Sequence, residues 1–281
     1  MIFVLLALAP VQATPPKPAP HAASEAAVTS ALKPAPSGPL DIRADRLQRC
    51  IALTQTDPAA ARAEAARWRI AGGRFAAREC AGLAFAAEKA WGSAAGEFEE
   101  AAREAQLAKN AGAANYWAQA GNAWLAAAQP AKARAALDSA LTAGTLTGLS
   151  LGEAQLDHAR ALVATGDLDS ARTDIDLALT NAADDPLAWL LSATLARREG
   201  NPVRAKKDIG EALRRSADDA SVQLEAGNIA ATAGDETAAR EAWGQAARLA
   251  PDTAVGRSAV TALRQFDGGT SAPRVSAPIG R

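Results

Sequence analysis

The chain has 281 residues, of which 49% are hydrophobic but only 4% are aromatic, and alanine supplies much of the apolar content. This composition favours helices that approach one another closely over a strand-rich sandwich, so the sequence predicts an all-α protein. Thirty basic and thirty-one acidic residues leave a formal net charge of −1, which gives no basic surface for nucleic acid or anionic lipid, so we expect no nucleic-acid partner.

Residues 1–13, MIFVLLALAPVQA, form an apolar run that is shorter than the roughly 20 residues needed to cross a bilayer. The run ends in small residues after Pro10, which is typical of a secretory signal cleaved after Ala13. No Lys or Arg precedes it, so a start further upstream or a disordered apolar N-terminus stays open. We expect a periplasmic chain without stable membrane insertion after cleavage. The first cysteine, Cys50, lies too far along for a lipid anchor at the cleavage point.

Residues 14–40 are rich in Pro and Ala and hold seven of the fifteen prolines. Proline removes backbone donors and favours extended polyproline II, so this segment is predicted to be a disordered, semi-rigid linker. Residues 267–281 are predicted to be a disordered tail. The folded region is therefore expected to span 41–266.

The folded region repeats itself every 34 residues, and four columns recur at this interval in its last three copies. They are the glycines Gly166, Gly200 and Gly234, the alanines Ala171, Ala205 and Ala239, the alanines Ala178, Ala212 and Ala246, and Asp184-Asp185 with Asp218-Asp219. Looser copies upstream place Ala61, Ala94 and Ala133 in the column of Ala171. Intervals of four, seven and eight within a copy put its small and bulky side chains on one helical face.

Each copy is predicted to be two antiparallel helices joined by a tight turn. Gly166-Asp167 and Gly234-Asp235 mark two of these turns, because glycine accepts the left-handed conformation that ends a helix and aspartate caps the next one. One copy buries its apolar face only against its neighbours, so a single unit is not expected to fold alone.

A 34-residue unit with this order of Trp, small residue, Gly-Asp, Ala, aromatic, Ala and Pro resembles the tetratricopeptide repeat family. The matching residues in the last two copies are Trp189, Ala193, Gly200, Ala205 and Ala212, then Gly227, Gly234, Ala239, Trp243, Ala246 and Pro251. The resemblance covers about 42–266 and implies a right-handed α-solenoid of about six helix-turn-helix repeats. It weakens near the N-terminus, where Gly72-Gly73 and a turn at Trp91-Gly92 replace the usual signals. A plain helical bundle or another α-solenoid shares the short helices but does not predict the 34-residue register.

Two intervals exceed the repeat length. Ala94 and Ala133 are 39 residues apart, and Ala133 and Ala171 are 38 apart. We assign the first excess to a longer helix around 93–110 and the second to a connection at 142–150.

Cys50 and Cys80 are the two cysteines, and each falls in the first helix of a neighbouring unit. First helices of adjacent repeats pack side by side, so export would allow a disulfide between them. The alternative is a pair of ordinary buried thiols.

In tetratricopeptide proteins the first helices line a groove that holds a segment of a partner protein. Carrying this geometry over gives the candidate partner-binding residues Asn115, Gln119, Asn122, Asp157, Arg160, Thr194, Arg197, Glu225 and Asn228. Amides and mixed charges can hydrogen-bond a partner backbone, although a merely solvated surface fits them equally well. The basic clamp that some family members use on acidic tails is disfavoured, because Ala118 and its neighbours lack the lysines.

Catalytic, metal and cofactor sites are not expected. The repeats occupy nearly all of the foldable length, and no zinc-ligand spacing, phosphate loop or nucleophile elbow occurs. His158 is interpreted as an interior histidine that faces its partner helix. The carboxylates Glu97, Glu99 and Glu100 are interpreted as a solvated helix face, although an acid pair there is the one place for envelope-polymer chemistry.

The tryptophans are expected to pack in the core, with the exception of Trp91, which we place in an exposed turn. The core set is Trp68, Trp117, Trp124, Trp189 and Trp243. The sequence thus predicts a non-catalytic scaffold or adaptor of the bacterial cell envelope that binds a protein segment. The alternatives are a cytoplasmic adaptor and, less favoured, an enzyme or regulatory subunit acting on envelope polymers.

Overall fold

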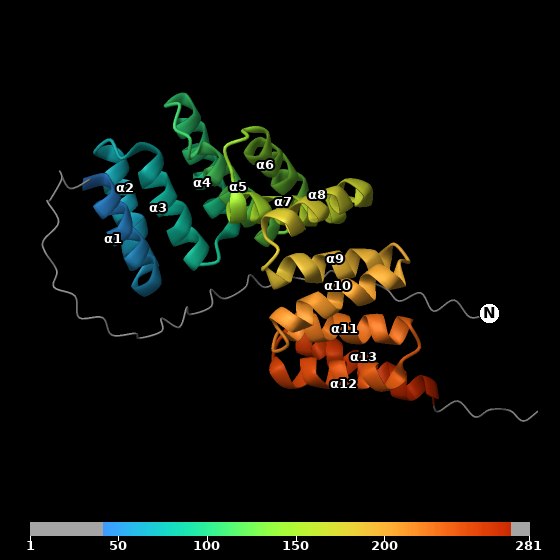
Figure 1. Cartoon of the computed structure of the whole chain (residues 1–281). Coiled ribbons are helices and arrows are strands. Elements are labelled where there is room, and N and C mark those ends of the chain that lie inside the picture. The colour runs from blue at the N-terminus through green and yellow to red at the C-terminus, as the bar shows by residue number, and fades with distance from the viewer. Residues whose placement is uncertain (1–41, 271–281) are drawn as a thin grey trace, which may run out of the picture. The chain divides into compact units, whose positions relative to one another are not determined.

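The structure is a computed structural model that describes residues 42–270, with side chains from 45 to 266. The predicted signal peptide at 1–13, the linker at 14–40 and residues 271–281 of the predicted tail lie outside these described residues. The described part consists of thirteen α-helices with no strand (Figure 1). The all-α prediction is confirmed.

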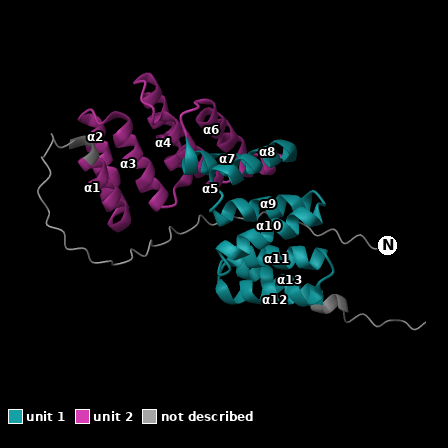
Figure 2. Ribbon diagram, in the orientation of Figure 1, with its two compact units in different colours: residues 1–12, 147–159, 166–281 teal, residues 13–146, 160–165 magenta. Residues whose placement is uncertain are grey.

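The described chain divides into two compact units (Figure 2). The N-terminal unit holds residues up to 146 together with 160–165, and the C-terminal unit holds 147–159 and the residues from 166 onward. The helices of the N-terminal unit are α1 (Ile42–Thr56), α2 (Pro58–Ile70), α3 (Arg74–Ala87), α4 (Trp91–Leu107), α5 (Ala113–Ala126) and α6 (Pro130–Thr142). Helix α7 (Gly148–Thr165) is divided between the units. The C-terminal unit continues with α8 (Leu168–Asn181), α9 (Pro186–Arg198), α10 (Pro202–Arg215), α11 (Ala220–Thr232), α12 (Glu236–Leu249) and α13 (Ala254–Thr270).

The helices pair in chain order as six hairpins, from α1–α2 to α11–α12, and α13 follows as a single last helix. First helices of successive hairpins contact each other, as α1 does α3 and α9 does α11. Helix α13 packs on both helices of the last hairpin, where Phe266 meets Trp243 edge to face with ring centroids 5.5 Å apart. The prediction of about six stacked repeats is therefore confirmed, with α13 covering the end of the stack.

Small residues line the contacts inside each hairpin. Ala171, Ala205 and Ala239 are at most 1% exposed. A β-carbon at Gly227 would lie 2.4 Å from the indole of Trp243, a distance that no packed side chain tolerates. The repeated columns are thus the places where two helix backbones approach, as the pattern predicts.

The tryptophans are buried to different extents. Trp68 and Trp243 are in the core at 4% and 5% exposure. Trp117, Trp124 and Trp189, also expected in the core, are half-buried. The turn predicted at Trp91-Gly92 is wrong, because the turn lies at Lys89-Ala90 and a half-buried Trp91 begins α4.

The long intervals have the predicted origin in one case and a modified one in the other. Helix α4 has 17 residues, which confirms a longer helix after Ala94. The second excess is shared, because α7 begins at Gly148 and extends for 18 residues, which leaves a shorter connection than the one predicted at 142–150. The folded region also ends later than predicted. Helix α13 continues past 266 to Thr270, since no proline interrupts the chain before Pro273.

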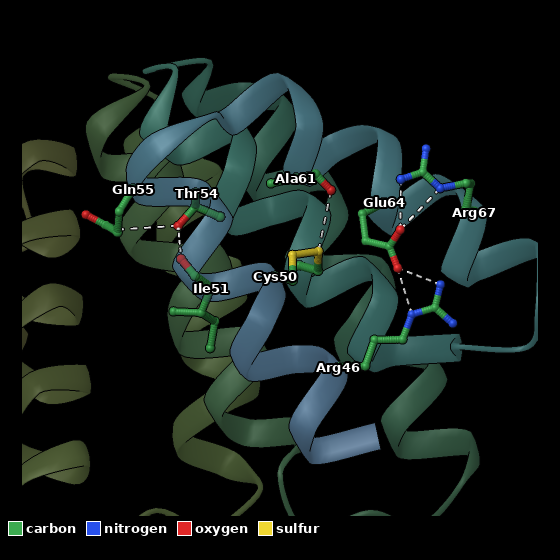
Figure 3. Close-up of a disulfide and its surroundings, with 9 residues drawn as sticks. Arg46, Cys50, Ile51, Thr54, Gln55, Ala61, Glu64 and Arg67 are labelled. Atoms are coloured by element: carbon green, nitrogen blue, oxygen red, sulfur yellow. Dashed lines mark hydrogen bonds and ion pairs between the residues drawn. A yellow bond between two sulfur atoms is a disulfide. The ribbon is translucent and has the colours of Figure 1, made fainter. Parts of the chain in front are cut away.

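A disulfide joins Cys50 of α1 to Cys80 of α3, with their Cα atoms 5.8 Å apart (Figure 3). Both residues are fully buried. Close by, Glu64 of α2 accepts from Arg46 Nε of α1 at 2.8 Å and from Arg67 Nη2 at 2.9 Å. These bonds, that of Arg46 foremost, hold the pKa of the Glu64 carboxyl below its usual range. The first hairpin is thus tied to the second covalently and held together by a charged clamp.

Candidate functional site

The nine candidate partner-binding residues all lie on first helices. In the N-terminal unit, α5 carries Asn115, Gln119 and Asn122, and α7 carries Arg160; in the C-terminal unit, α7 carries Asp157, α9 carries Thr194 and Arg197, and α11 carries Glu225 and Asn228. Their contact with a partner stays a prediction. The structure shows which of them interact with one another.

Arg197, Glu225 and Asn228 are joined in one network. Arg197 donates from Nε to Glu225 Oε1 at 2.7 Å and from Nη2 to Oε2 at 3.2 Å. Asn228 Nδ2 donates to Glu225 Oε2 at 3.0 Å, and its Oδ1 accepts from Trp243 Nε1 at 3.1 Å. The Glu225 side chain is 8% exposed, and a buried carboxylate needs such partners to replace lost hydration. The network therefore fixes α9, α11 and α12 to one another.

The network changes what this surface offers to a partner. Both oxygens of Glu225 and both ends of the Asn228 amide are already bonded inside the unit. Among the described residues, Thr194 makes no side-chain hydrogen bond, and Arg197 keeps a side-chain exposure of 23%. The hydrogen-bonding capacity left on this face thus belongs to Thr194 and Arg197.

The α5 face presents amides in a different state. Asn115 and Asn122 are exposed. The Gln119 Oε1 atom is buried and has no hydrogen-bond donor in the described part of the chain. A buried acceptor without a donor raises the free energy of the folded state, so a donor supplied by a bound segment would lower it.

Sequence reasoning missed a pair on the same face of the N-terminal unit. Tyr116 of α5, the one tyrosine of the chain, donates from its hydroxyl to Glu79 Oε2 of α3 at 2.9 Å. Burial raises the pKa of Glu79, and the Tyr116 hydrogen bond opposes that shift. Burial, with the adjacent Glu79 charge, also raises the pKa of Tyr116 far above its ordinary value. The position of a lone tyrosine next to Asn115 was the available signal.

Asp157 lies in acidic surroundings. Burial first, then the charges of Asp185 and Asp157, raise the pKa of Glu153. Burial, with Asp157 contributing, also raises the pKa of Asp185. Among the described residues no group of three or more His, Cys, Asp or Glu side chains is arranged to hold a metal ion.

His158 faces its partner helix, as predicted, with Nδ1 2.6 Å from Asp174 Oδ2 of α8. The next hairpin repeats the arrangement, because Ser192 Oγ donates to Asp208 Oδ2 at 2.6 Å. Both members of the second pair lie 34 residues beyond the first. The polar pair is therefore a feature of the repeat that links two helices of one hairpin, and this register was visible in the sequence.

The carboxylates of α4 are bound to arginines and to an indole. Glu97 pairs with Arg78 Nη1 at 3.1 Å. Arg103 pairs with both Glu99 and Glu100, and Trp124 Nε1 donates to Glu99 at 2.7 Å. Three carboxylates engaged in this way fit the interpretation as a charged helix face and give no support to an acid pair.

No protein-family model matches the sequence, and no curated protein matches it. Several solved structures are similar in fold. The type IV pilus biogenesis factor PilW superposes with a TM-score of 0.64 at 18% identity, covering 78% of this chain and 99% of that one. PilF of Pseudomonas aeruginosa gives 0.62 at 16% identity with the same coverages. YrrB, a tetratricopeptide protein with an unusual peptide-binding site, gives 0.50 at 18% identity, covering 67% of this chain and 91% of that one.

At these identities the likeness concerns the fold alone. The 34-residue register, the helix hairpins and the buried small residues agree with it. The chain therefore has the tetratricopeptide repeat fold, as its sequence resemblance implies.

Proposed function

We propose that this protein is a non-catalytic scaffold or adaptor of the bacterial cell envelope that binds a segment of a partner protein on its first helices. The observation that carries the proposal is the stacking of tetratricopeptide hairpins, which places first helices beside each other within each unit. A row of parallel helix faces suits an extended or helical polypeptide better than a small substrate. PilW and YrrB, whose folds are similar, act in pilus biogenesis and bind peptide, respectively.

Two observations support the envelope. The Cys50–Cys80 disulfide fits an oxidising compartment, since disulfides rarely persist in the cytosol. Residues 1–13 have the pattern of a cleaved secretory signal. In the described part of the chain, none of the helices has both the length and the apolar character to cross a membrane.

Site-specific cross-linking tests the binding face. A photoreactive residue is placed at Asn115 or Thr194, and, as a matched control, at Ala135, which is exposed on the second helix α6. We expect the first two positions to cross-link one identifiable protein in cells and Ala135 to give no adduct with it. Equal labelling from all three positions would remove the first-helix face as the site.

Localisation has its own test. The protein is isolated from fractionated cells in the presence of a thiol alkylating agent and without reductant. A mature N-terminus at Thr14 and no alkylated cysteine are expected. An intact N-terminus at Met1 with both thiols alkylated would favour the cytoplasmic adaptor instead.

A further inference from the structure

The C-terminal unit has a hollow of about 470 Å³ on its second helices, away from the first-helix candidate residues. Leu179 of α8, Trp189 of α9 and Val203 of α10 supply its apolar wall. Asn201, Arg204 and Lys207 supply most of its polar edge. It lies within one compact unit, so its lining is set by the packing of three consecutive helices.

The apolar wall is exposed at one point and rigid at another. Val203 is 81% exposed. Trp189 is held in place, because its Nε1 donates to the Ala183 carbonyl at 2.8 Å and the Arg215 guanidinium lies 5.0 Å from its ring centroid. A fixed indole beside an exposed valine is a preformed contact for another apolar side chain, because little ordering is needed on binding.

The charges at the hollow are unequally engaged. Arg204 donates from Nε to Asp208 at 3.2 Å and forms an ion pair with Asp176. Lys207 is exposed and has neither an ion pair nor a hydrogen bond in the described part of the chain. Lys207 lies one helical turn after Val203, so both side chains project from the same face of α10. The hollow therefore combines an apolar wall with one available cation.

Asn201 adds a second donor. Its Oδ1 accepts from the backbone N–H of Arg204 at 3.1 Å, as the N-cap of α10. The amide nitrogen of the same side chain is left to donate. A carboxylate is the group that accepts from both an ammonium and an amide.

A second hollow, in the N-terminal unit, provides a contrast. It is lined by Phe85 and several alanines, with Arg62, Arg69 and Glu97 among its polar groups. Arg62 pairs with Glu88 at 3.0 Å and Arg69 with Glu97 at 3.7 Å. Its cations are balanced internally, so it offers no comparable charge to a ligand.

We propose that the hollow between α8, α9 and α10 docks a segment of a partner protein in which an apolar side chain lies next to an aspartate or glutamate. The apolar side chain packs on Val203 and Trp189, and the carboxylate accepts from Lys207 and Asn201. This second-helix surface is separate from the first-helix face, so it gives the protein two places at which to hold polypeptide.

Two short peptides test the proposal on the full chain. The probes are acetyl-Ala-Leu-Glu-Leu-Ala-amide and the same peptide with Gln in place of Glu. NMR titration follows the indole N–H of Trp189. We expect the Glu peptide to bind with a dissociation constant on the order of millimolar, as suits so small a contact, and about tenfold more tightly than the Gln peptide at low salt.

Matched variants locate the binding. Lys207→Met keeps the length of the side chain and is expected to reduce binding of the Glu peptide to the level of the Gln peptide. Val203→Ser is expected to weaken both peptides. Lys206→Met, at an exposed neighbour outside the lining, should change nothing.

Three outcomes would overturn the proposal. They are equal binding of the two peptides, equal loss in the Lys206 and Lys207 variants, and self-association of the protein that Val203→Ser abolishes, since a second copy would then be the occupant. Cross-linking from Asn115 and Thr194 is unaffected by any of these variants, so failure here is distinguishable from failure of the proposed function.

Discussion

The hairpin turns of the two units reach the same backbone conformation with different residues. In the C-terminal unit Gly166, Gly200 and Gly234 take positive φ angles of 90°, 70° and 79°. In the N-terminal unit Lys89 and Ala128 take the corresponding turns at 60° and 55°. A side chain in this region costs about 1 kcal/mol relative to glycine.

The residue after each turn differs in the same direction. Asp167, Asn201 and Asp235 cap the second helices of the C-terminal unit by accepting backbone N–H bonds. Ala90 and Gln129 stand at that position in the N-terminal unit and make no capping bond. The difference teaches that packed small residues define the repeat, while turn chemistry adds stability that the N-terminal unit lacks. The disulfide offsets part of that loss.

Removing the disulfide should have the largest effect. Replacing Cys50 and Cys80 with Ala should lower the free energy of unfolding of the N-terminal unit by about 3–4 kcal/mol, the loop-closure entropy of a bridge that spans 30 residues. Urea unfolding followed by circular dichroism measures it. An unchanged midpoint would mean that the turns of this unit need no such support.

Packing at the small columns comes next. Gly227→Ala drives a β-carbon into Trp243 and should destabilise by about 1–3 kcal/mol. Gly244→Ala is the control, because its β-carbon would meet only the end of Arg248 at 3.5 Å, and helix propensity makes it neutral or stabilising. Equal effects at the two glycines would contradict the role given to the columns.

Exchanging turn residues between the units sharpens the comparison directly. Replacing Ala128-Gln129 by Gly-Asp should stabilise the third hairpin by about 1–2 kcal/mol, since it relieves the left-handed alanine and adds a cap. The reverse exchange of Gly234-Asp235 for Ala-Gln should destabilise the sixth hairpin by a similar amount. Thermal unfolding measures both variants. Changes of the same sign would show that the two turns are not equivalent.

A smaller, pH-dependent effect is expected at Glu79 of the N-terminal unit. Its raised pKa means that ionisation disfavours the folded state, so this contribution to stability is full at low pH and is lost as the pH rises through the folded-state pKa. Glu79→Gln keeps an acceptor for Tyr116 and should be more stable than wild type at pH 7 by at most about 1 kcal/mol. The gain should vanish in acid. Glu241→Gln, at an exposed position of the C-terminal unit, controls for charge removal, and a gain that persisted in acid would exclude this cause.

The sequence predicted most where turn chemistry and packing agree. The last three hairpins follow from glycines, caps and alanines that share one register. The turn at Lys89-Ala90 was misplaced, because neither residue favours a turn and Trp91-Gly92 resembles one more closely. There tertiary packing overrides local preference.

The candidate site was placed on the correct helices because the small column fixes which side chains share a face. The bonds among Arg197, Glu225 and Asn228 were not foreseen, since they depend on the distance between neighbouring hairpins. The contact of Tyr116 with Glu79 has the same origin. The pairs formed by His158 and Ser192 with the second helices follow the repeat and were open to prediction.

The covalent link between α1 and α3 also decides where such an array comes apart. Repeats that touch only their neighbours fray from their ends. Here the first hairpin cannot peel away from the second while Cys50 and Cys80 stay joined. A protease or an unfolding motor that engages the amino end meets a closed loop, whereas α13 at the carboxyl end is held by packing alone, so spontaneous unravelling starts from that end.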